Sequence, residues 1–93
     1  MLSKDIWNEY KKIGIVDSGV FGFIYKAKNK IKGDYVLIEE INKDIYIKFT
    51  SLDLIQEEIQ IKLSLDNNIK EIKDTNKYIY FIRDLFLYIS KNI

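Results

Sequence analysis

The spacing of hydrophobic residues changes twice along this chain, and that change limits the folds it can adopt. From Phe21 to Lys28, large apolar residues recur at every second position, which is typical of a β-strand with one buried face. From Ser51 to Leu65 the spacing becomes helical, and short β-like runs return after Asn68. The pattern predicts an α+β domain in which one main helix packs against an antiparallel sheet.

Five segments have the length and composition of strands, and turns containing Asp, Asn and Gly separate several of them. The predicted strands are Tyr10–Val16, Phe21–Lys28, Tyr35–Ile41, Ile69–Lys73 and Tyr78–Ile82. Short helices are also predicted at Ser3–Tyr10, with Ser3 as the N-cap, and at Leu85–Ile89. Because 93 residues suffice for one small domain, we expect a single domain over residues 1–93.

The main predicted helix, Ser51–Leu65, carries two apolar stripes on roughly opposite sides. The first stripe is Leu52, Ile55, Ile59 and Leu63, and the second is Leu54, Ile61 and Leu65. A helix that is apolar on two sides needs two packing partners, and this chain's own sheet supplies one of them. We therefore expect the second stripe to form an interface with another protein or with a second copy of the chain.

The composition excludes several classes of function. The chain has no Cys and no His, which excludes disulfides, Cys/His metal sites and catalysis by histidine. Its 15 basic and 14 acidic residues are interleaved, so no nucleic-acid partner is expected. The apolar runs are too short to cross a membrane, and the N-terminus lacks the apolar core of a signal peptide. A cytoplasmic location is therefore expected.

The stretch IGIVDSGVFGFIYKAK, from Ile13 to Lys28, places two glycines three residues apart between two predicted strands. It resembles the glycine-rich loop of eukaryotic protein kinases, G-x-G-x-x-G-x-V. Gly19 and Gly22 match the second and third glycines, and Ile24 matches the Val. Asp17 stands where the first glycine belongs.

Further segments follow in the order found in the N-terminal lobe of such kinases. Residues 36–39, VLIE, resemble the third-strand motif V-A-I-K, and Glu57 and Glu58 are the two candidates for the ion-pairing Glu of helix αC. Residues 65–69 resemble the turn after that helix, and residues 78–85 resemble the fifth strand and hinge. The resemblance implies a kinase N-lobe-like five-stranded sheet with an αC-like helix. It also implies vestigial nucleotide-site positions at Gly19, Gly22, Ile24, Leu37, Glu39 and Glu58.

Departures from the family pattern predict that ATP with Mg²⁺ binds weakly or not at all. Glu39 replaces the Lys that contacts the phosphates, and a carboxylate there repels a polyphosphate. Leu37 replaces a small Ala and would intrude on the adenine, and Asp17 adds a negative charge near the phosphates. Glu40 is a poor substitute because it points to the other face of the strand. In the simpler interpretation, Glu39 is a solvated strand residue and Leu37 fills the core.

Two functions follow from the resemblance. The first is a non-catalytic kinase-like N-lobe that acts as a protein-interaction or regulatory module, with no catalytic residue, metal or cofactor. Its partner would be a kinase, a C-lobe-like chain or a second copy. The alternative is the N-terminal part of a serine/threonine protein kinase that binds ATP, with its catalytic lobe missing from this chain. The H-R-D and D-F-G motifs would then follow residue 93, and Lys26 or Lys28 would replace the missing Lys.

Overall fold

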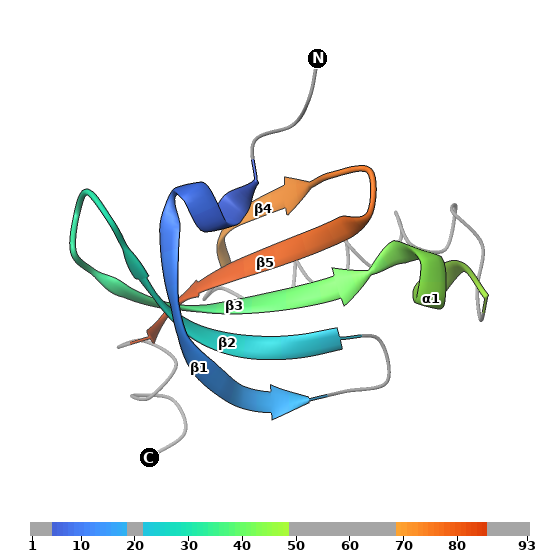
Figure 1. Cartoon of the computed structure of the whole chain (residues 1–93), viewed down its shortest axis with the longest axis horizontal. Helices are drawn as coiled ribbons and strands as arrows, with labels where there is room; N and C mark the ends of the chain where they lie inside the picture. The colour runs from blue at the N-terminus through green and yellow to red at the C-terminus, as the bar shows by residue number, and fades with distance from the viewer. Residues whose placement is uncertain (1–4, 19–21, 49–68, 86–93) are drawn as a thin grey trace.

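The strands of this protein form one antiparallel sheet, in the order β1-β2-β3-β5-β4 (Figure 1). The structure is a computed structural model that describes residues 5–18, 22–48 and 69–85. Within these ranges the strands are β1 (Tyr10–Ser18), β2 (Gly22–Asn29), β3 (Tyr35–Asn42), β4 (Ile69–Asp74) and β5 (Tyr78–Asp84). The five-stranded antiparallel sheet predicted from the sequence is thereby confirmed, and each strand overlaps its predicted range.

The main predicted helix, Ser51–Leu65, lies outside the described residues together with both of its apolar stripes. The predicted helix at Leu85–Ile89 lies outside them except for its first residue. The predicted helix at Ser3–Tyr10 is wrong in extent, because the described helical turn is the 3-10 segment η1 (Ile6–Asn8) and Tyr10 already belongs to β1. Asp5 caps this turn by accepting a hydrogen bond from the backbone N–H of Trp7 at 3.0 Å.

One face of the sheet packs against η1, which crosses it at the N-terminal end of the chain (Figure 1). Ile6 of η1 is buried there together with residues from β1, β2, β3 and β5. These are Tyr10, Ala27, Val36, Ile38, Tyr80 and Ile82, with Trp7 and Tyr78 packed against the cluster. We call this side of the sheet the Trp7 face. Alternation along each strand determines which residues lie on the Trp7 face, because every second side chain of a strand points to the same side.

The opposite side of the sheet, which we call the Glu39 face, holds a second apolar cluster. Tyr46 packs there with Ile79 and Phe81 of β5, and residues of β3 and β4 surround them. Tyr46 comes from the short helix α1 (Lys43–Ile47), which no sequence pattern predicted. The Asn42 side chain caps this helix by accepting hydrogen bonds from the backbone N–H groups of Asp44 and Ile45, at 2.9 and 3.3 Å.

The β2–β3 hairpin turns at Gly33, which has a φ of +79°. That backbone conformation strains residues with a side chain, so glycine is favoured here. The side chain of Asn29, at the end of β2, accepts hydrogen bonds from the backbone N–H groups of Ile31 and Lys32. This hairpin sets the register that places Lys26 opposite Leu37 and Ile24 opposite Glu39.

Candidate functional site

The sequence-predicted nucleotide-site positions that the structure describes lie together on the Glu39 face. Residues directly opposite each other in an antiparallel pair point to the same side of the sheet. Ile24 is opposite Glu39, and Leu37 is opposite both Lys26 on β2 and Arg83 on β5. Gly19 and Glu58 lie outside the described residues, so their relation to this face stays a prediction.

Gly22 has a packing role that does not depend on a nucleotide. A Cβ atom at this position would lie 1.8 Å from the backbone carbonyl oxygen of Glu40 and 2.9 Å from its carbon. Real Cβ atoms essentially never approach another atom so closely, so a side chain would force β2 away from β3. Gly22, which matches the third glycine of the kinase loop, is therefore required for the close approach of β2 to β3 where their pairing begins.

Glu39 forms an ion pair with Arg83, with 3.0 Å between the Glu39 Oε1 and Arg83 Nη1 atoms. Only 22% of the Glu39 side chain and 12% of the Arg83 side chain are exposed. The interpretation of Glu39 as a solvated strand residue is therefore wrong. Its diagonal neighbour on β5 supplies a cation and a hydrogen-bond donor, which offset the cost of removing the carboxylate from water.

Leu37 is 3% exposed and contributes to the core, as the simpler interpretation predicted. The two lysines considered as substitutes for the kinase Lys lie on the same face, farther along β2. Their amino groups stand over the ring of Tyr35, at 5.1 Å for Lys26 and 5.6 Å for Lys28. Both distances fall within the range of a cation–π contact.

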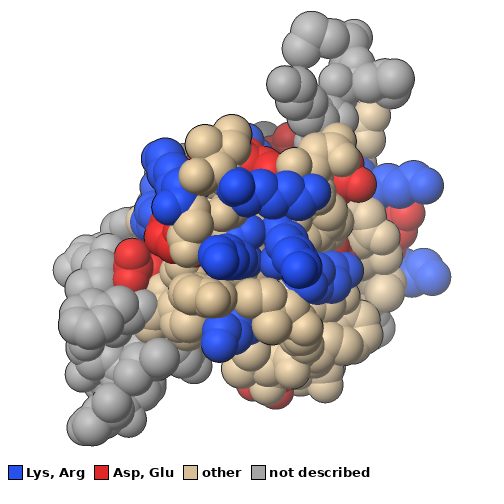
Figure 2. All heavy atoms as spheres, turned by 60° about the vertical axis from the view of Figure 1, so that its left-hand side comes forward, with Lys and Arg blue, Asp and Glu red and all other residues tan. Residues whose placement is uncertain are grey.

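Basic side chains are unevenly distributed although the net charge of the chain is +1. Figure 2 shows Lys and Arg side chains gathered near the centre of one view of the molecule, with acidic side chains mostly at its margin. In the register, Lys11 of β1 is opposite Lys28, and the following turn adds Lys30 and Lys32. The hairpin therefore concentrates positive charge that the overall composition conceals.

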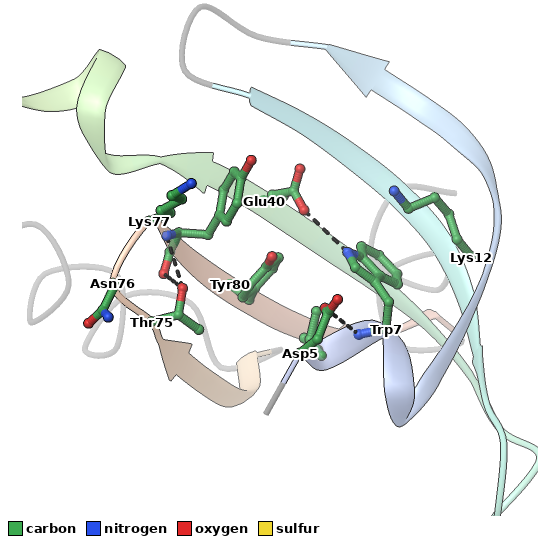
Figure 3. A pocket seen from close by; sticks show the side chains of 10 residues that line it. Asp5, Trp7, Lys12, Glu40, Thr75, Asn76, Lys77 and Tyr80 are labelled. Carbon is green, nitrogen blue, oxygen red and sulfur yellow. Dashed lines mark hydrogen bonds between the residues drawn. The ribbon is translucent and has the colours of Figure 1, made fainter. Parts of the chain in front are cut away.

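The Trp7 face contains a pocket of about 470 Å³ between η1 and the β4–β5 turn (Figure 3). Its walls combine aromatic, acidic and basic side chains from segments far apart in the sequence. The lining residues are Asp5, Ile6, Trp7, Lys12, Glu40, Thr75, Asn76, Lys77, Tyr78 and Tyr80. Sequence reasoning missed this pocket because its parts come together only through the strand order. The paired aromatic residues of β5 and the single Trp were the available signal.

Glu40 lies at the centre of the hydrogen bonding in this pocket. Its side chain points away from the Glu39 face, as the alternation of the strand predicted, and accepts a hydrogen bond of 3.3 Å from the indole Nε1 of Trp7. Burial, followed by the charge and hydrogen bonding of Glu40, raises the pKa of the Tyr80 hydroxyl above its ordinary value. The Tyr80 hydroxyl therefore donates a hydrogen bond to the Glu40 carboxylate.

The part of the chain that the structure describes contains no group of three or more His, Cys, Asp or Glu side chains placed to hold a metal ion. None of the helices in those same ranges is long and apolar enough to cross a membrane.

Comparison of the sequence with protein-family models found no matching family, and comparison with curated proteins found no similar protein.

Proposed function

We propose that this chain is a non-catalytic, kinase-like N-lobe that acts as a protein-interaction or regulatory module. The observation that carries the proposal is an exposed apolar stretch on the edge strand β1. Ile13, Ile15 and Val16 are all among the exposed large hydrophobic residues of the described chain, and Ile15 is 61% exposed. Phe23, on the neighbouring strand, is also exposed and extends this apolar surface.

The two edges of the sheet differ in a way that supports an interface at β1. The outer strand β4 carries Lys70, Glu71 and Lys73, and charged side chains on an edge strand discourage pairing with another chain. Two of these charges are also held in place, because Lys70 pairs with Asp34 at 3.0 Å and Lys73 with Glu9 at 3.3 Å. From residue 13 to residue 16, β1 has no charged side chain.

An added strand is the mode of recognition that fits such an edge. The outer N–H and C=O groups of an edge strand can pair with a strand from another protein, while its side chains contact those of the partner. β1 departs from regular pairing with β2 between Lys12 and Gly14 and again between Ile15 and Asp17. These irregularities limit an added strand to a short segment, whose contacts are strengthened by the three exposed apolar residues.

The Glu39 face supports the non-catalytic part of the proposal. A nucleotide held as in a kinase needs a cation at the position of Glu39 and a small residue at the position of Leu37. Here the carboxylate is joined to Arg83, and Leu37 is buried. Binding of ATP would require breaking an internal ion pair and moving a core side chain, and it would regain neither contact.

The experiment that tests the interface is the mass of the purified chain in solution, measured by light scattering up to millimolar concentration. We expect self-association that Ile15→Lys abolishes, because a buried lysine on the contact edge costs desolvation. Ile31→Lys is the matched control, since Ile31 is 90% exposed in the β2–β3 turn. A wild-type chain that stays monomeric, or two variants that behave alike, would contradict an interface at β1.

One observation favours the alternative of an ATP-binding kinase fragment: Lys26 is on the same face as Leu37 and directly opposite it. Titration calorimetry with ATP and Mg²⁺ separates the two functions. We expect a Kd for ATP no lower than about 1 mM. Binding near 1 μM, which corresponds to about −8 kcal/mol, together with its loss in Lys26→Met, would replace our proposal with the alternative.

A further inference from the structure

The aromatic side chains of the pocket on the Trp7 face are arranged as walls that meet at a corner. The rings of Trp7 and Tyr80 are nearly perpendicular, at 89°, with their centroids 6.3 Å apart. Tyr78 lies beside Tyr80 at 5.8 Å and an interplanar angle of 37°. Figure 3 shows Trp7 and Tyr80 among the side chains that line the pocket, with Glu40 above them in this view. Aromatic faces carry partial negative charge, so such a corner attracts a cation.

Two carboxylates add to this attraction. Glu40 is fixed by hydrogen bonds from the Trp7 indole and the Tyr80 hydroxyl, both of which are neutral donors. These donors orient the carboxylate and leave its negative charge in the pocket. Asp5 also lines the pocket, and its Oδ1 atom is fixed by the backbone N–H of Trp7 at 3.0 Å. Both acids are therefore held in place before any ligand arrives.

The chain itself places an ammonium group against the same aromatic cluster. The Nζ atom of Lys12 lies 4.4 Å from the centroid of the Trp7 ring and 4.1 Å from that of Tyr25. Lys12 and Lys77 both line the pocket, so its two acids and two bases balance. A neutral pocket lined by aromatic rings favours a cation that is weakly hydrated, because such a cation loses little on leaving water.

We propose that this pocket binds an alkylammonium group, supplied either by a free small molecule such as choline or by a methylated lysine side chain of a partner protein. The volume of about 470 Å³ is sufficient for such a group and part of the chain that carries it. Of the lining residues only Lys12 belongs to β1, and none is one of the exposed apolar residues Ile13, Ile15 and Val16. The test of this pocket does not depend on the proposed interface, and either can fail alone.

Trp7 is the only tryptophan of the chain, so its fluorescence reports directly on the pocket. Titration with choline should produce a saturable change. The neutral analogue 3,3-dimethyl-1-butanol, which has nearly the same shape, should bind about ten-fold more weakly because it makes no cation–π contact. This comparison uses the wild-type chain and so does not depend on the folding of any variant. Equal binding of the two compounds, or no saturable change below about 10 mM choline, would overturn the proposal.

Two variants, one that removes a negative charge from the pocket and one that removes a positive charge, provide a second test. Glu40→Gln should weaken choline binding, whereas Lys12→Gln should strengthen it by removing a competing positive charge. Glu71→Gln is the matched control, since it makes the same charge change on β4, away from the lining residues. Tighter binding to Glu40→Gln, or an equal loss in Glu40→Gln and Glu71→Gln, would contradict a cation site.

The source of the group is decided by comparing choline with a short peptide that contains trimethyllysine and with its unmodified counterpart. Tighter binding of the trimethylated peptide than of choline assigns the pocket to a protein partner. Tighter binding of choline assigns it to a small molecule. Equal binding of the unmodified and trimethylated peptides would show that methylation is not recognised and would overturn the proposal for that arm.

Discussion

Gly22→Ala tests whether this glycine is required by the close approach of β2 to β3. The added Cβ atom would lie 1.8 Å from the carbonyl oxygen of Glu40, whereas ordinary contact begins at 3.4 Å. The two strands must therefore separate by the difference, about 1.6 Å, at this point. A ladder hydrogen bond of about 2.9 Å would then exceed 4 Å and break.

The magnitude follows from the place of Gly22 at the first pair of the β2–β3 ladder, opposite Ile41. Loss of one or two hydrogen bonds costs about 1 kcal/mol each, and disturbed packing around Ile41 adds a similar amount. We expect the free energy of unfolding to fall by about 2–3 kcal/mol. In a domain of this size, that loss lowers the Tm by roughly 8–24 °C.

Two other glycines serve as matched controls for the same substitution. A Cβ atom at Gly14 would meet nothing within 4 Å, so Gly14→Ala should change stability by less than about 0.5 kcal/mol. Gly33 also has open space, but its φ of +79° predicts a cost of about 1 kcal/mol. Urea denaturation followed by circular dichroism measures all three variants.

The expected order of destabilisation is Gly22→Ala first, then Gly33→Ala, then Gly14→Ala. If Gly22→Ala is as stable as Gly14→Ala, the contact with β3 does not constrain this position. The presence of a glycine at position 22 would then need a different explanation.

Three further predictions concern ionisable side chains. Arg83→Met should lower the free energy of unfolding by about 1–3 kcal/mol, and a double-mutant cycle with Glu39→Gln in which the two losses simply add would show that the ion pair contributes nothing. Because burial and a neighbouring glutamate raise the pKa of Tyr80, the stability it contributes is present below pH 10 and lost as the pH rises above it. Tyr80→Phe should therefore flatten the alkaline decline in Tm, and an unchanged decline would contradict this assignment. The hydrogen bond from Lys70 lowers the pKa of Asp34, so its contribution is present above about pH 4 and lost as the pH falls. Asp34→Asn should flatten the acid decline in Tm, and a slope equal to that of the wild type would argue against this pair in solution.

The strands could be predicted from the sequence because alternation with a period of two is a local signal. Tyr35 begins β3 and Tyr78 begins β5, as predicted. The short helix α1 was missed because five residues are too few to show a helical period, and only Asn42 marked its start. The helix predicted at Ser3–Tyr10 was too long because the amphipathic spacing continues into Tyr10, although that residue begins β1 and packs in the core.

The chemistry of the sites depended on contacts that no local pattern contains. The sequence identified Glu39 as a departure from the kinase pattern, but its partner Arg83 lies 44 positions away and was not considered. The pocket on the Trp7 face joins η1 to the β4–β5 turn, and its assembly required the strand order. Leu37 was interpreted correctly because a large apolar residue in a central strand has a single common explanation.

If the β1 edge pairs with a strand from another chain, as proposed, the contrast between the two outer strands limits each chain to one added strand. An apolar edge on both sides of a sheet lets copies add without limit, which leads to fibres. Here the charged side chains of β4 discourage pairing at that edge, and the exposed apolar stretch lies on β1. If two copies pair antiparallel through β1, the β1 edge of each chain is covered by β1 of the other, and the contact closes on a two-fold axis. An assembly built in this way ends at two chains, and a partner that supplies the added strand competes directly with the second copy.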